Sequence, residues 1–165
     1  MPDAAKFATD RAPLCPAPDP RPAPPTRFKV PAGAVDCHAH IIGLPPRYPL
    51  VETRSYTAPE ASPQAYLAML KATGMTHGVL VQPSVHGTDN SLIAETLRAQ
   101  KGKLRGVAVV APEISERELE ALNEAGYRGC RLNLRHGPHA GVDPSLRTQQ
   151  ERILNECATK EQLLK

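Results

Sequence analysis

The amino-acid sequence predicts an α/β protein built from four successive βα units with parallel strands. From residue 34 onward, short runs of apolar and β-branched residues alternate with longer amphipathic stretches. Capping residues precede these stretches and glycines follow several of them, which is typical of α-helices. A helix then separates each strand from the next, and such connections make neighbouring strands parallel.

The segment before the first unit has a different composition. Residues 1–33 hold nine of the chain's 18 prolines, which favour extended backbone and withhold amide donors from a sheet. We therefore expect residues 1–33 to form an extended or disordered arm and residues 34–165 to form the folded part.

The first two units follow the arm directly. The first strand is predicted over 34–41, and its helix spans 62–74, with a Ser-Pro start and a glycine end. The second strand is predicted over 77–84, and its helix runs from about 90 to 100 with leucine and isoleucine on one side.

The last two units show the same order. The strand at 104–110 precedes a helix over 115–126 that opens with a capping box and ends at a glycine. The strand at 127–134 leads through a Gly/Pro loop to a helix within 145–165.

Composition excludes several classes of protein. The net charge of +3 is small, so nucleic-acid binding is not expected. The four cysteines are scattered without a C-x-x-C pair, which argues against a structural zinc site or a disulfide scaffold. The sequence has neither an apolar run long enough for a membrane span nor a secretory signal. We expect a cytoplasmic protein without a membrane partner.

The first strand carries an acid and two histidines at alternate positions. In a regular strand Asp36, His38 and His40 would share one face. The two histidines could bind Zn²⁺ or, without a metal, hydrogen-bond a substrate oxygen; a pair of satisfied core histidines is the structural alternative. The strand is not followed by the G-x-G-x-x-G turn of a dinucleotide-binding fold, so a cofactor of that class is not expected.

Polar residues also mark the ends of two other strands. Arg131 and Asn133 alternate on the fourth strand, and an inward arginine there suits a substrate carboxylate, or else an internal ion pair with an acid. Gln82, Ser84 and His86 end the second strand and begin its loop, where substrates bind in parallel α/β folds. Each of these three could instead cap a backbone group.

Five ordered blocks carry a family resemblance: "DCHAHIIG", "RSYTAPEAS", "GVLVQPSVHGTDNS", "RGVAVV" and "GYRGCRLNL". They resemble the amidohydrolase superfamily, most closely its metal-independent branch of 2-pyrone-4,6-dicarboxylate lactonase-like hydrolases. The resemblance covers about residues 13–142. It implies a TIM (β/α)₈ barrel and hydrolysis of a lactone or ester of a small, carboxylated, dicarboxylate-like substrate.

The resemblance also implies roles for individual residues. His38 and His40 would be catalytic and serve the substrate carbonyl without a cofactor, with Zn²⁺ bound by the same pair as the alternative. Tyr56 would close over the substrate, and Arg131 would contact a carboxylate. Gln82, Ser84, His86 and Asn133 complete the predicted substrate-binding set. The general base of the family is an aspartate after the eighth strand, which no residue of this sequence matches.

Four units amount to the N-terminal half of such a barrel, which takes about 250 residues. We expect a truncated and inactive fragment of a lactonase-like hydrolase. The alternatives are a metal-dependent amidase or decarboxylase of the same superfamily, and a non-catalytic half-barrel that oligomerises. Because the inner face of four strands lacks its opposite wall, the isolated chain is expected to be poorly soluble or at least a homodimer.

Overall fold

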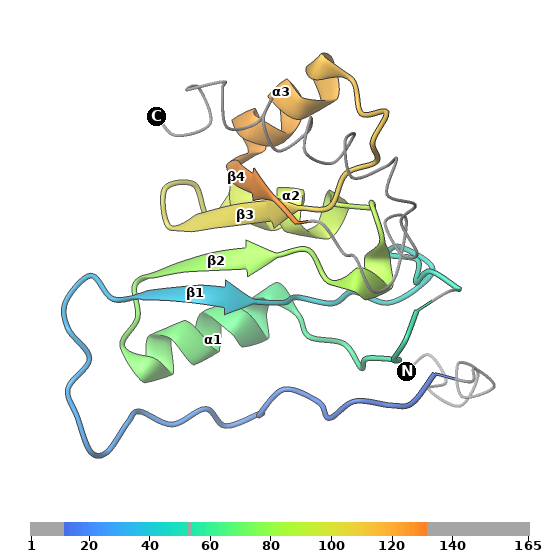
Figure 1. Cartoon of the computed structure of the whole chain (residues 1–165). Helices are drawn as coiled ribbons and strands as arrows, with labels where there is room; N and C mark the ends of the chain where they lie inside the picture. Colours follow the sequence, from blue (N-terminus) through green and yellow to red (C-terminus); the bar gives the residue numbers. More distant parts are fainter. Residues whose placement is uncertain (1–11, 53, 132–165) are drawn as a thin grey trace, which may run out of the picture.

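The computed structural model describes residues 12–52 and 54–131. Its four strands form one sheet in the order β1-β2-β3-β4, in which all neighbouring strands are parallel (Figure 1). The strands are β1 (Val35–Ala39), β2 (His77–Val81), β3 (Leu104–Ala108) and β4 (Tyr127–Cys130). This arrangement confirms the predicted α/β fold with parallel βα units. Asn133 and the predicted helix within 145–165 lie outside the described residues.

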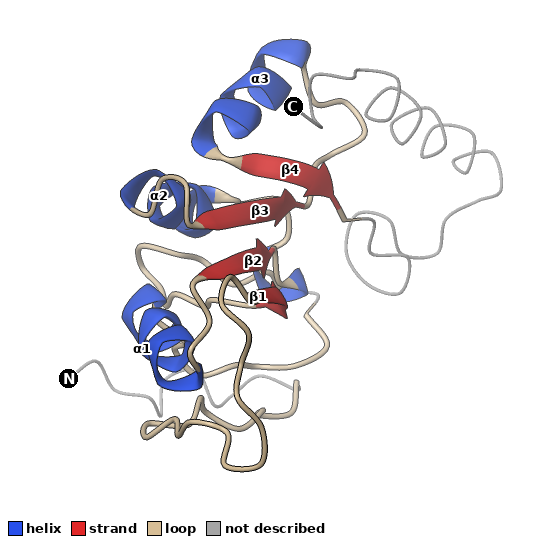
Figure 2. Ribbon diagram, turned by 90° about the vertical axis from the view of Figure 1, so that its left-hand side faces the viewer, coloured by secondary structure: helices blue, strands red, loops and turns tan. Residues whose placement is uncertain are grey.

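The three α-helices of the described residues lie on the same side of this sheet (Figure 2). They are α1 (Pro63–Thr73), α2 (Ser91–Ala99) and α3 (Glu116–Ala125), and a short 3₁₀ helix, η2 (Ser84–His86), precedes α2. The predicted caps form at two of them. The Ser62 side chain accepts a hydrogen bond from the amide of Ala65 at α1, and Ser115 and Glu118 form the capping box of α3.

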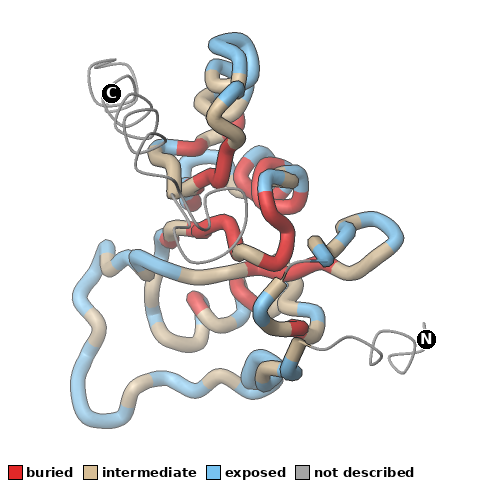
Figure 3. Tube along the Cα trace, turned by 45° about the vertical axis from the view of Figure 1, so that its right-hand side comes forward, coloured by how far each residue is buried: buried red, intermediate tan, exposed pale blue. Residues whose placement is uncertain are grey.

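The hydrophobic core lies between the sheet and the helices (Figure 3). Leu80 of β2, Leu97 of α2 and Leu104 of β3 are almost fully buried there. Gly106 of β3 is part of the same packing, because a Cβ at this position would lie 2.6–2.8 Å from the Tyr127 and Leu97 side chains. No helix of the described residues is long and apolar enough to cross a membrane.

The described part of the arm, residues 12–33, is extended and runs along the outside of the domain (Figure 1). It is attached through one isolated bridge to the loop after β1. Here the amide of Cys15 donates to the Thr57 carbonyl at 3.0 Å, and the amide of Thr57 donates to the Pro13 carbonyl at 2.8 Å. Leu14 and Phe28 remain mostly exposed, so the arm adds little to the core.

Candidate functional site

The candidate site lies at the carboxyl ends of the strands, where parallel α/β folds bind their ligands. His38 and His40 come from the end of β1, Gln82 from the end of β2 and Arg131 from the end of β4. The rings of His38 and His40 meet edge to face, with centroids 5.0 Å apart and planes at 83°. The structure therefore brings the two histidines into direct contact.

Asp36 does not share a face with these histidines, which corrects the prediction from strict alternation. Asp36 pairs with Gly78 and Ala39 pairs with Leu80, so β1 uses three steps where β2 uses two. Because of this extra residue, Asp36 and His40 point to opposite faces of the sheet, although they are four positions apart. Asp36 instead lies near Tyr66 of α1. Burial raises the pKa of the Tyr66 phenol, and the negative charge of Asp36 raises it further.

His40 is the better defined of the two histidines. Its Nδ1 lies 2.7 Å from the carbonyl oxygen of Val81, which only accepts, so Nδ1 carries the proton and donates it. Burial lowers the pKa of His40 below its usual value, aided by the charges of His38 and Arg131, whereas the bond to Val81 raises it. His40 is therefore neutral near pH 7, and its Nε2 presents a lone pair.

The Arg131 side chain extends from the end of β4 to the end of β2. Its amide donates to the carbonyl of Ala108 at 2.6 Å, and its Nη1 donates to the carbonyl of Gln82 at 3.2 Å. Within residues 12–52 and 54–131, Arg131 makes no ion pair, in contrast to the structural alternative of an internal acid partner. In the described part of the chain the bond to Gln82 is the only hydrogen bond of the guanidinium, so its other donors can take an anion. Arg131 and His40 lie in one site, because they bond the carbonyls of the consecutive residues Gln82 and Val81.

Gln82 serves this site through its backbone. Its side chain is 1% exposed and donates from Nε2 to the carbonyls of Gly87 at 3.2 Å and Asp89 at 2.7 Å. The amide therefore shapes the loop between β2 and α2. The structure gives Gln82 the backbone-capping role that was the alternative to substrate contact.

His86 is also engaged within the protein. Its Nδ1 lies 3.0 Å from the carbonyl of Pro49, and its Nε2 accepts from the amide of Gly43 at 3.3 Å. With the side chain buried and both nitrogens bonded, His86 ties together two points of the loop after β1. It offers no free nitrogen to a substrate in this arrangement, and Ser84 begins the same 3₁₀ turn, half-buried.

Tyr56 lies in the loop between β1 and α1, as predicted. It is half-buried and packs against a small cluster formed by Ile42, Ala58 and Val85. The loop between β1 and α1 is also joined to the segment between β2 and α2, because the amide of Val51 donates to the Val85 carbonyl at 2.8 Å. Tyr56 thus packs on a second hydrophobic cluster, which includes Val85 of η2.

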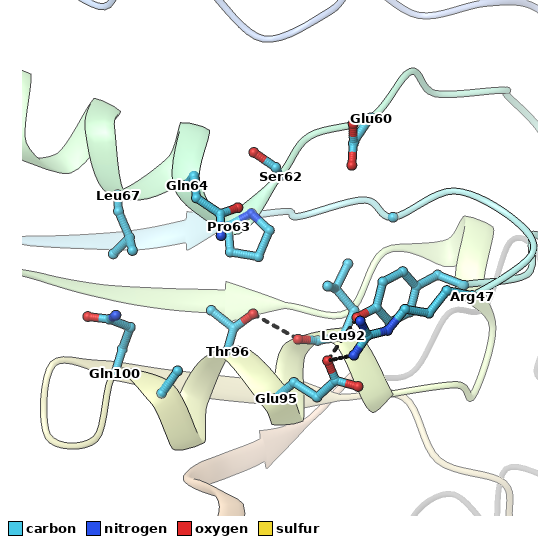
Figure 4. Close-up of a pocket in the computed structure, with 13 residues that line it drawn as sticks. Arg47, Glu60, Ser62, Pro63, Gln64, Leu67, Leu92, Glu95, Thr96 and Gln100 are labelled. Carbon is cyan, nitrogen blue, oxygen red and sulfur yellow. Dashed lines mark hydrogen bonds and ion pairs between the residues drawn. The ribbon is translucent and has the colours of Figure 1, made fainter. Parts of the chain in front are cut away.

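Two anchors of these loops were not apparent from the sequence. Glu95 of α2 accepts from Arg47 at 2.7 Å and from the Tyr48 hydroxyl at 2.8 Å, which fastens the loop after β1 beside a groove of about 400 Å³ between α1 and α2 (Figure 4). The Asn90 side chain bonds both the amide and the carbonyl of Val109, as a neighbouring strand would. Both anchors join residues that are far apart in the sequence, 47 positions for Tyr48 and Glu95 and 19 for Asn90 and Val109, so no local pattern marks them.

A metal would find an incomplete set of ligands here. His40 fits one ligand, because a metal-binding histidine commonly donates its other ring N–H to a backbone carbonyl. His38 is adjacent and adds a second nitrogen. In the described part of the chain, however, no three His, Cys, Asp or Glu side chains come together as a metal site would require.

Comparisons with known proteins agree with this architecture. A family model described as Amidohydrolase matches residues 35–160. The 2-pyrone-4,6-dicarboxylate hydrolase of Comamonas testosteroni is 41% identical over 107 residues, covering 65% of this chain and 35% of that protein. A 4-sulfomuconolactone hydrolase of Rhizobium radiobacter is 36% identical over 130 residues, covering 78% of this chain and 43% of that protein.

A solved structure is similar as well. The crystal structure of a probable 2-pyrone-4,6-dicarboxylic acid hydrolase from Acinetobacter baumannii, with citric acid bound, matches with a TM-score of 0.66 and 32% identity. The match covers 77% of this chain and 46% of that one. The chain thus spans less than half the length of these relatives. Because the family model extends over most of the sequence, including all four strands, the chain belongs to the amidohydrolase family.

Proposed function

We propose that the chain carries part of the active site of a hydrolase that opens a small lactone bearing carboxylate groups. The observation that carries this proposal is Arg131, whose guanidinium makes no ion pair in the described part of the chain and bonds the carbonyl of Gln82, next to the Val81 carbonyl that His40 bonds. A planar donor fork of this kind suits a carboxylate. Two relatives are named for hydrolysing 2-pyrone-4,6-dicarboxylate and 4-sulfomuconolactone, which supports an anionic substrate.

The residues divide the work by their hydrogen-bonding capacity. Arg131 anchors a substrate carboxylate with N–H groups that Gln82 does not use. His40 accepts a hydrogen bond or a proton at Nε2, because its Nδ1 proton is committed to Val81. The initial interpretation had both histidines polarise the substrate carbonyl. Since neutral His40 has no second proton to donate, we assign that task to His38 alone.

A metal-dependent amidase or decarboxylase is the second candidate. The bond from His40 Nδ1 to Val81 favours it, because this arrangement orients Nε2 as a metal ligand. A bound Zn²⁺ would polarise a carbonyl as a Lewis acid. The described residues supply two nitrogens and no third ligand, so we route no step through a metal.

Alanine substitution tests the proposal. His38→Ala and His40→Ala should leave the circular dichroism spectrum unchanged and weaken binding of 2-pyrone-4,6-dicarboxylate in isothermal titration calorimetry. One lost hydrogen bond corresponds to about 0.5–1.5 kcal/mol, or roughly a two- to twelvefold change in Kd. His77→Ala is the matched control, because that exposed histidine of β2 bonds only to neighbouring Thr76 among the residues that the structure describes. Equal affinity of all variants and the parent would reject both histidines as site residues.

A further inference from the structure

The extra residue in β1 decides where the two histidines point. Gly78 and Leu80, the partners of Asp36 and Ala39, both face the helices: a Cβ at Gly78 would overlap the Tyr66 hydroxyl, and Leu80 belongs to the core. Asp36 and Ala39 therefore face the helices too. His40 follows Ala39 and turns to the opposite side of the sheet.

A regular strand would give a different result. With Asp36 toward the helices, strict alternation would send His38 and His40 toward the helices as well, away from Arg131. The additional residue lets Asp36 face the helices while His40 faces the other side of the sheet. Bulges of this kind commonly occur beside active sites, where they redirect a side chain.

A bulge leaves backbone groups without a partner in the ladder, and these need another hydrogen bond. In β1 the amide of His38 donates to Oδ1 of Asp36 at 3.2 Å. The same carboxylate lies near Tyr66, a residue of α1 that is only 6% exposed, and a Cβ at the neighbouring Gly78 would overlap the Tyr66 hydroxyl. The Asp36 carboxylate thus accepts a hydrogen bond from a backbone amide of the bulge while its side chain lies against α1.

We propose that Asp36 is a positioning residue whose carboxylate holds the bulge that turns His38 and His40 toward the substrate side of the sheet. It does not touch the substrate; it acts through the backbone of His38. The inference rests on the proposed function only for the choice of ligand, because the contact between the two imidazole rings is measurable without any ligand.

The experiment compares Asp36→Ala with Asp36→Asn in the full chain. Alanine removes the acceptor, whereas asparagine keeps an Oδ1 in the same place. We expect Asp36→Ala to abolish the nuclear Overhauser effect between the His38 and His40 ring protons and to weaken citrate binding about fivefold. Asp36→Asn should retain both. Asp19→Ala is the matched control, since Asp19 accepts the amide of Arg21 through the same i to i+2 bond in the arm.

The outcomes separate this inference from the proposed function. An unchanged ring contact in Asp36→Ala overturns the positioning role, whatever the ligand does. A lost ring contact in a protein that binds no citrate or 2-pyrone-4,6-dicarboxylate supports the positioning role and counts against the proposed substrate class. If Asp36→Ala does not fold, Asp36→Leu repeats the test with a side chain of similar shape. Unfolding of both, with Asp36→Asn folded, would show that Asp36 serves the fold instead and would overturn the proposal.

Discussion

Replacing Arg131 by lysine keeps the positive charge and removes the planar fork. In the structure one Nη1 proton goes to the Gln82 carbonyl, which leaves the remaining donors for a ligand. A carboxylate held by two of them would lose one charged hydrogen bond in Arg131→Lys, a cost of about 1–3 kcal/mol. This corresponds to a roughly five- to 150-fold rise in Kd for 2-pyrone-4,6-dicarboxylate, measured by isothermal titration calorimetry.

Arg128 of β4 provides the control. Arg128 also donates to backbone carbonyls, those of Asn123 and Tyr127, but it does so at the opposite end of the strand. Arg128→Lys should leave the Kd unchanged. An Arg131→Lys variant that binds the dicarboxylate as tightly as the parent would refute the assignment of Arg131 to a substrate carboxylate.

Four further outcomes are expected. Because the folded chain holds the pKa of His40 below 6.5, the unfolded chain binds more protons below that pH, so the free energy of unfolding should fall as the pH drops from 6.5 through the folded pKa. Urea unfolding in EDTA should show this slope in the parent and a weaker one in His40→Asn; equal slopes would contradict it. Elemental analysis should find well under one equivalent of zinc, and a stoichiometric amount would favour the metal-dependent candidate. Light scattering should find at least a dimer, because Val35 is 45% exposed on the strand β1 and the inner sheet face carries no helix in the described residues; a monodisperse monomer would argue against this. Ser115→Ala should destabilise the chain by about 1 kcal/mol through loss of the α3 cap, and an unchanged urea midpoint would contradict that role.

The strands and helices were predictable because their signals are local. Ser62 and Gly74 bound α1 through their own backbone preferences, and Ser115 does the same for α3. The direction of neighbouring strands followed from the helices between them. These features need no knowledge of distant residues.

The site was only partly predictable for the opposite reason. The spacing of Asp36, His38 and His40 is that of a regular strand, and nothing in it reveals the register shift against β2. A polar residue at the end of a strand can face a ligand or the protein itself. Gln82 and His86 turned out to bond their own loops, which depends on where Gly87 and Pro49 lie in space.

The most direct test of the central claim is a titration of the ¹⁵N-labelled chain with 2-pyrone-4,6-dicarboxylate, followed by NMR at the side-chain nitrogens. We predict that His40 Nε2 and the guanidinium of Arg131 shift together along one binding curve, because both belong to one site at the carboxyl ends of the strands. His40 Nδ1 should stay protonated and bonded to Val81 throughout. The account would be contradicted if neither group responded, or if the two followed curves with different Kd values.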